Sequence, residues 1–172
     1  MVSAESSTDR LVARNADFAA EFRDGHLPPK PRLAVAVVAC MDTRLRVHVA
    51  LGLSAGEAHI LRNAGGVITD DVIRSLCISQ RELGTREIVL VHHTDCGLAS
   101  LNEEQFMADL EVETGSTPSW RVQAFDDPYD DVRESIDRLQ ASPFLPHTDA
   151  IRGFVYDVSD GRLREVRVDV HE

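Results

Sequence analysis

Four residues in two short segments carry the strongest chemical signal in this chain of 172 residues. Cys40 and Asp42 stand in Cys-Met-Asp-Thr-Arg, and His93 and Cys96 stand in His-Thr-Asp-Cys-Gly. Two thiols and an imidazole form a soft nitrogen-and-sulfur donor set that fills three corners of a tetrahedral zinc site and leaves the fourth corner open. Water or substrate binds at such an open corner, so the pattern predicts a catalytic rather than a closed zinc site.

A carboxylate and a guanidinium follow the first of these candidate ligands. Asp42 and Arg44 are separated by one residue, so their side chains can pair within a turn beside the metal. The alternative interpretation of Arg44 is an ordinary surface charge. We expect the pair to form, because the short spacing favours it.

Each half of the candidate site follows a run of apolar residues. The uninterrupted apolar run at 33–39 is typical of a central parallel strand that is buried on both faces, and it ends at Cys40. Residues 87–92, whose middle four are apolar, predict a further strand that ends at His93. In open α/β sheets, ligands bind beyond the carboxyl ends of the strands. If these two strands are neighbours, the side chains of Cys40, His93 and Cys96 converge at one edge of the sheet.

The remaining pattern predicts the α/β class, with a mostly parallel central sheet flanked by helices, an N-terminal helical arm and a C-terminal hairpin. The predicted helices cover residues 8–22, 70–84, 102–115 and 128–140, and the further strands cover 58–62, 152–158 and 164–168. The chain is then a single domain of residues 1–172. Its arm, residues 1–32, is cut off by a proline segment, and we expect it to pack on a partner subunit, with packing on its own domain as the alternative.

The composition limits the classes of partner. The net charge of −11 and the pI near 5.0 argue against nucleic acid and anionic membranes, which attract basic surfaces. The polar N-terminus does not resemble a secretory signal, and no apolar run approaches the roughly 20 residues that cross a bilayer. We therefore expect a cytoplasmic protein whose three cysteines are thiols or metal ligands rather than disulfides.

Other reactive residues have simpler interpretations. Cys77 lies on the apolar stripe of its helix and is expected in the core, and His92 should point to the face of the sheet opposite His93. The acidic residues at 126–131 favour a helix start over a calcium site. Two non-catalytic alternatives remain for the main site: a structural zinc with Asp42 as a permanent fourth ligand, and a redox switch formed by the two candidate thiol ligands.

The motifs together resemble the β-class carbonic anhydrases. That family is marked by Cys-x-Asp-x-Arg followed some fifty residues later by His-x-x-Cys-Gly, and the resemblance covers nearly the whole chain. The segments 62–66, 71–76, 83–87 and 92–97 match its short, minimal branch. This branch also contains hydrolases of carbonyl sulfide and carbon disulfide.

The resemblance implies a role for each residue of the site. Zinc would be held by Cys40, His93 and Cys96, and Asp42 and Arg44 would form a catalytic dyad. In the open form Arg44 holds Asp42 away from the metal, whereas in a closed form Asp42 itself is the fourth ligand.

The resemblance also implies the reaction, which is the reversible hydration of carbon dioxide to bicarbonate by zinc-bound hydroxide. The alternative on the same zinc site is hydrolysis of carbonyl sulfide to carbon dioxide and hydrogen sulfide. The backbone of Ala64, Gly65 and Gly66 would help to form the substrate pocket. The family forms homo-oligomers, so a dimer or a tetramer is expected.

Overall fold

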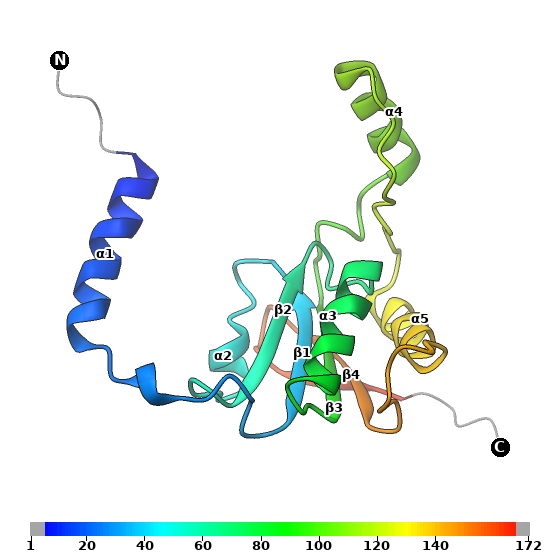
Figure 1. Ribbon diagram of the computed structural model, residues 1–172. Helices are drawn as coiled ribbons and strands as arrows, with labels where there is room; N and C mark the ends of the chain where they lie inside the picture. Colours follow the sequence, from blue (N-terminus) through cyan, green and yellow to red (C-terminus); the bar gives the residue numbers. More distant parts are fainter. Residues whose placement is uncertain (1–5, 168–172) are drawn as a thin grey trace, which may run out of the picture.

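The computed structural model describes residues 6–167 and confirms the α/β class (Figure 1). In chain order the elements are α1 (Ser7–Glu21), η1 (Asp24–His26), β1 (Val35–Cys40), α2 (Val47–Ala50), β2 (Ala58–Asn63), α3 (Asp70–Arg81), β3 (Glu87–His93), α4 (Glu103–Thr114), α5 (Pro128–Gln140), β4 (Ile151–Tyr156) and β5 (Leu163–Val166). The end of the last predicted strand, residue 168, lies outside the described residues. Between residues 6 and 167, no helix combines the length and the apolar character that a membrane crossing needs.

The sheet brings the two predicted ligand-bearing strands side by side. Its strand order is β2-β1-β3-β4-β5, and β1 pairs in parallel with both β2 and β3. Ala39 pairs with Val91, so β1 and β3 end at the same edge of the sheet, at Cys40 and His93. Strand β5 runs antiparallel to β4, which confirms the predicted C-terminal hairpin.

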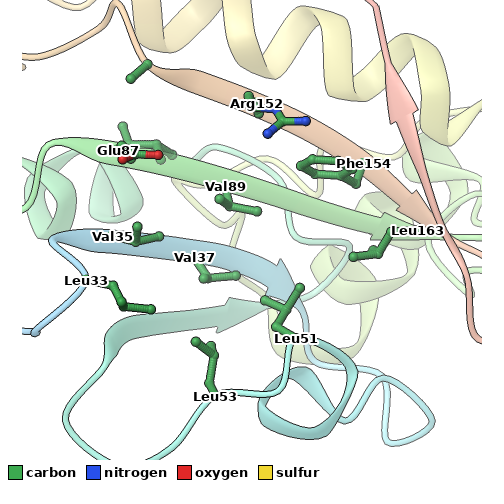
Figure 2. A pocket seen from close by; sticks show the side chains of 12 residues that line it. Leu33, Val35, Val37, Leu51, Leu53, Glu87, Val89, Arg152, Phe154 and Leu163 are labelled. Atoms are coloured by element: carbon green, nitrogen blue, oxygen red, sulfur yellow. The ribbon is translucent and has the colours of Figure 1, made fainter.

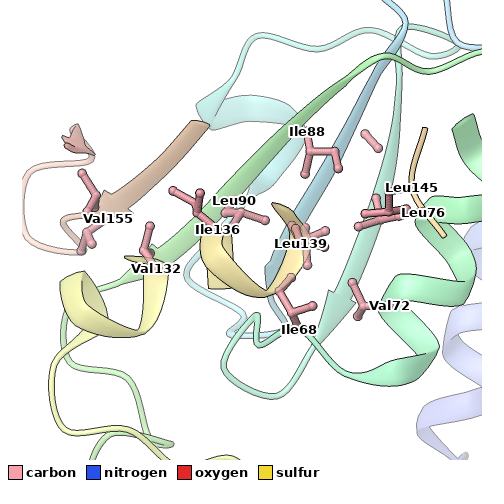
Figure 3. Close-up of a cluster of buried hydrophobic side chains, with 13 residues drawn as sticks. Ile68, Val72, Leu76, Ile88, Leu90, Val132, Ile136, Leu139, Leu145 and Val155 are labelled. Carbon is pink, nitrogen blue, oxygen red and sulfur yellow. The ribbon is translucent and has the colours of Figure 1, made fainter. Parts of the chain in front are cut away.

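Helices α3 and α5 cover one face of the sheet, and the main core lies between these helices and the sheet (Figure 3). Each helix presents an apolar stripe at helical spacing, because residues three and four apart share a face. The buried members of these stripes are Val72 and Leu76 on α3 and Val132, Ile136 and Leu139 on α5. They pack against the side chains of one face of β1 and β3, and this packing fixes both strands in place.

The helix ends agree with the sequence except at α3. The sequence predicted a helix that reaches residue 84, whereas α3 ends at Arg81 with Glu82 as its C-cap, and the side chain of Thr69 caps its start. Asp70 and Asp71 lie in the first turn, where the helix dipole favours a negative charge. Helix α4 is capped by Asn102 and ends at Gly115, which has the left-handed conformation (φ 67°), as predicted.

Helices α1 and α4 extend away from the body of the protein (Figure 1). Every residue of α1 is exposed, and its apolar side chains lie in solvent, with Leu11 60%, Val12 65% and Phe18 62% exposed. Helix α4 likewise has no buried residue, and its Val112 is 86% exposed. Helix α1 therefore forms an extended N-terminal arm in the single chain.

Candidate metal centre

The three predicted metal donors lie together at the carboxyl edge of the sheet. Cys40, His93 and Cys96 are all buried, and their donor atoms lie within 4.8 Å of one another. The two Sγ atoms are 4.0 Å apart. Two sulfurs that each lie about 2.3 Å from a tetrahedral zinc are separated by about 3.8 Å, so the observed spacing fits a shared ion. It is far longer than a disulfide bond of about 2.05 Å, and both cysteines are free thiols.

The orientation of His93 leaves one ring nitrogen available. Its Nδ1 lies 2.9 Å from the carbonyl oxygen of Thr94, so Nδ1–H donates and Nε2 carries the lone pair. Nε2 is buried, and it has no hydrogen-bond partner among residues 6–167. A buried polar atom without a partner costs about 1–3 kcal/mol, a cost that a metal ion at this position would remove. The residues present therefore fit the metal that the donor set predicts.

The two thiols interact through a hydrogen bond between their sulfur atoms. This hydrogen bond from Cys96 lowers the pKa of Cys40. The same hydrogen bond, together with burial, raises the pKa of Cys96 well above its usual value. A divalent cation held by both sulfurs would favour loss of the remaining proton.

Asp42 and Arg44 form the predicted ion pair. The Nε of Arg44 donates to Asp42 Oδ1 at 3.0 Å, and its Nη2 donates to Asp42 Oδ2 at 2.8 Å. This guanidinium holds the pKa of the Asp42 carboxyl well below its usual range. Asp42 Oδ2 also lies 3.8 Å from His93 Nε2, so the carboxylate borders the donor set while Arg44 holds it.

Two residues of the site were not identified from the sequence. The Arg62 side chain donates to the carbonyl of Cys40 at 2.8 and 2.9 Å and to the carbonyl of Asp42 at 2.7 Å, so it fixes the turn that carries both residues. Asp95 accepts hydrogen bonds from Arg44 through both its carboxylate and its carbonyl. Arg62 and Asp95 both lie in the segments that match the family motifs, at or just beyond the end of a strand. These two features of the sequence could have identified them as residues of the site.

The glycine turn packs tightly on the end of β1. Gly65 and Gly66 have left-handed φ values of 77° and 78°. A Cβ on Gly66 would lie 2.9 Å from the backbone nitrogen of Cys40, and one on Gly65 would lie 2.4 Å from Leu98 Cδ2. Glycine at both positions therefore allows the turn to pack closely beside the candidate ligand Cys40. Ala64 lines an apolar hollow together with Leu98, and none of the candidate donors is among the residues that line this hollow. Contact of residues 64–66 with substrate stays a prediction.

The other reactive residues have structural surroundings. His92 is fully buried, and its Nε2 lies 2.5 Å from the carboxylate of Asp131 on α5. Asp127 caps α5, so the acidic segment does start a helix. Cys77 is partly buried against the core. In the described part of the chain, Cys40, His93 and Cys96 are the one group of three or more such side chains close enough to share a metal.

Comparison with known proteins gives one family. The sequence model of the carbonic anhydrase family matches residues 35–163. Beta-carbonic anhydrase 1 of Mycobacterium tuberculosis is 50% identical over 159 residues, which cover 92% of this chain and 97% of that protein. Carbon disulfide hydrolase of Saccharolobus solfataricus is 30% identical over 188 residues, which cover 95% of this chain and 91% of that protein.

The fold is also similar to that of solved structures. The crystal structure of carbonic anhydrase from Streptococcus mutans has a TM-score of 0.88 and 45% identity, and the match covers 96% of this chain and 100% of that one. The sequence motifs, the arrangement of the donors and these similarities agree. The chain belongs to the β-carbonic anhydrase family.

Proposed function

We propose that this protein is a zinc enzyme that catalyses the reversible hydration of carbon dioxide to bicarbonate. The observation that carries the proposal is the buried Cys-His-Cys donor set beside the carboxylate of Asp42, which Arg44 binds. The Nε2 of His93 in this set has no hydrogen-bond partner within residues 6–167. Zinc in such a site lowers the pKa of water to about 7 and so supplies hydroxide at neutral pH. Cys40, His93 and Cys96 would hold the ion.

Asp42 would orient the attacking oxygen. Its carboxylate stays ionised across the neutral pH range, because the hydrogen bonds from Arg44 keep its pKa low. An ionised carboxylate accepts a hydrogen bond and so directs the lone pair of the donor oxygen toward the carbon of the substrate. Arg44 would meanwhile keep Asp42 away from the metal, and the ion pair between the two side chains supports an open form of the site.

The surroundings of the donor set suit a small apolar gas. Val67, Val91 and Leu98 are buried in the same apolar cluster as Cys40 and Cys96. Apolar walls exclude bulk water from the reacting atoms and leave the few polar groups to act in a low dielectric. A linear molecule such as carbon dioxide needs no charged group for its binding.

The alternative activity is hydrolysis of carbonyl sulfide on the same site. It is favoured by the 30% identity to a carbon disulfide hydrolase, because both sulfides are linear molecules with an electrophilic carbon. Carbon dioxide is the preferred substrate in this proposal, since the β-carbonic anhydrase of M. tuberculosis is 50% identical.

The deciding experiment measures both reactions on one zinc-loaded preparation. Proton release in a stopped-flow instrument reports hydration of carbon dioxide, and sulfide release reports hydrolysis of carbonyl sulfide. The proposal expects hydration to be the faster reaction. Sulfide release without hydration would favour the alternative, stoichiometric zinc without either reaction would favour a structural metal, and zinc-free protein with a Cys40–Cys96 disulfide would favour the redox switch.

We also propose that the protein is a homo-oligomer and that its N-terminal arm packs on a second copy. The second face of the sheet offers an apolar groove on β1 and β3, lined by Leu33, Val35, Val37, Leu51, Leu53 and Val89 among others (Figure 2). Helix α1 carries matching apolar side chains that its own chain leaves in solvent. Large apolar patches of this kind mark interaction surfaces.

A further inference from the structure

Arg44 donates hydrogen bonds to two acidic residues, and one of them lies in the other half of the metal site. One edge of its guanidinium, Nε and Nη2, faces the carboxylate of Asp42. The other edge faces Asp95, where Nη1 donates to Oδ2 at 2.7 Å and Nη2 donates to the carbonyl oxygen at 2.8 Å. The guanidinium is a planar, rigid fork, so contacts on two edges fix its orientation.

The backbone of Asp95 is shaped for this contact. Its φ of 54° lies in the left-handed region, which aspartate tolerates better than most residues with a side chain. Asp95 stands between His93 and Cys96, and the carbonyl of the preceding Thr94 accepts the hydrogen bond from His93 Nδ1. Two consecutive carbonyls of this short loop therefore position a candidate metal ligand and the arginine of the dyad.

Stability of the fold does not explain this arrangement. The side chain of Asp95 is 79% exposed and that of Arg44 is 46% exposed. Ion pairs this exposed contribute little to folding, because water screens them. What the contact does change is the freedom of Arg44, which would otherwise be a long side chain with many rotamers beside Asp42.

We propose that Asp95 is a positioning residue that holds Arg44 against Asp42 and so keeps the Asp42 carboxylate off the metal. The inference rests on the proposed function. Asp42 has two competing partners, the guanidinium of Arg44 and the metal, and its Oδ2 lies only 3.8 Å from His93 Nε2. An arginine that is fixed in place competes better for Asp42 than a mobile one. Loss of the Asp95 carboxylate therefore shifts the site toward the closed form.

The test is anion binding to the open metal position in the cobalt(II)-loaded protein, followed by visible absorption during titration with thiocyanate. Asp95→Asn and Asp95→Gly both tolerate a positive φ, so neither change disturbs the backbone of the loop. We expect the apparent Kd for thiocyanate to rise roughly fivefold or more in both variants, because only the open fraction binds. Activity of the zinc-loaded variants should fall by the same factor.

The direction of this shift separates the proposal from simple electrostatics. Removal of a negative charge near the metal would by itself tighten anion binding, whereas the proposal requires weaker binding. Asp71→Asn is the matched control, because Asp71 is also an exposed carboxylate paired with an arginine, Arg74, but lies on α3. In an Asp42→Ala background no closed form exists, and Asp95→Asn should then no longer weaken thiocyanate binding.

Three outcomes overturn the inference. They are unchanged or tighter thiocyanate binding in Asp95→Asn, an equal effect of the Asp71→Asn control, and a full effect of Asp95→Asn in the Asp42→Ala background. If the wild-type enzyme hydrates carbon dioxide, any of these outcomes refutes only the role of Asp95 and leaves the proposed function intact. A wild-type protein without this activity would instead refute the proposed function.

Discussion

Helices α5 and α1 are both amphipathic, yet the single chain buries only one of them. Helix α5 packs Val132, Ile136 and Leu139 against the sheet, whereas α1 leaves Leu11 and Phe18 in solvent. An apolar stripe indicates that a face will be buried but does not say against what. One chain is sufficient to bring the candidate metal donors together, whereas the apolar face of α1 stays exposed in the single chain and fits the proposed packing on a second copy.

The same contrast separates the two faces of the sheet. The face under α3 and α5 forms the closed core, which holds β1 and β3 in place through Ala36, Val38, Ile88 and Leu90. The opposite face carries the open apolar groove of Leu33, Val37 and Val89. Changes at the carboxyl edge should therefore alter the chemistry of each chain, and changes in the arm should alter assembly.

The largest effect is expected at the candidate ligands. Cys96→Ser replaces a soft thiolate by a hydroxyl that zinc binds poorly, so zinc affinity should fall by about 100-fold or more, with loss of carbon dioxide hydration. Metal analysis after dialysis measures the effect. Cys77→Ser is the control, because it makes the same change on α3 and should leave the zinc content unaltered. Full zinc occupancy in Cys96→Ser would remove this residue from the ligand set.

Asp42→Ala should separate metal binding from catalysis. The donor set remains, so zinc should stay bound, but kcat/KM for hydration should fall by about 10²-fold or more, because the attacking oxygen loses its hydrogen-bond acceptor. Parallel zinc analysis and stopped-flow assays provide the comparison. Activity near that of wild type would show that the carboxylate is not needed for the reaction.

Gly66→Ala tests the packing beside the candidate ligand. The new Cβ would lie 2.9 Å from the backbone nitrogen of Cys40 at a residue with φ 78°, so we expect the free energy of unfolding to fall by about 2–3 kcal/mol. Gly84→Ala is the matched control, since its φ is 76° but no atom of the described part of the chain lies within 4 Å of its Cβ position, and it should cost about 1 kcal/mol. Urea unfolding measures both, and equal losses would refute the clash.

The smallest effect on the metal centre is expected from the arm. Replacement of Leu11 and Phe18 by serine removes exposed apolar surface from α1, so light scattering should detect a smaller assembly, while the zinc content per chain stays the same. Arg14→Ser, also exposed on α1, is the control and should leave the mass unchanged. An unchanged mass after both apolar replacements would argue against an interface formed by the arm.

Much of the fold could be predicted because its signals are local. Apolar runs gave β1 and β3 with ends at or near Cys40 and His93, and the caps Asn102 and Gly115 gave the ends of α4. The family and the α/β class are confirmed. The roles of the individual site residues stay predictions until metal and activity are measured.

The residues that were missed depend on contacts that no local pattern contains. Arg62 reaches the carbonyls of Cys40 and Asp42 because β2 pairs in parallel with β1, with Cys40 opposite Asn63. Asp95 meets Arg44 because its backbone adopts a left-handed conformation. Register between strands and the φ value of one loop residue are set by tertiary packing, which the periodicity of a sequence does not report.

The parallel pairing of β1 with β3 has a consequence for the order of events during folding. Cys40 and Cys96 are 56 residues apart, and they meet only after β1 has paired with β3. Non-local parallel pairing is slow, because the intervening chain must be ordered before the contact forms. Metal capture by the full donor set would thus be a late step in folding, and the rate of cobalt(II) uptake during refolding would report when the parallel sheet is complete.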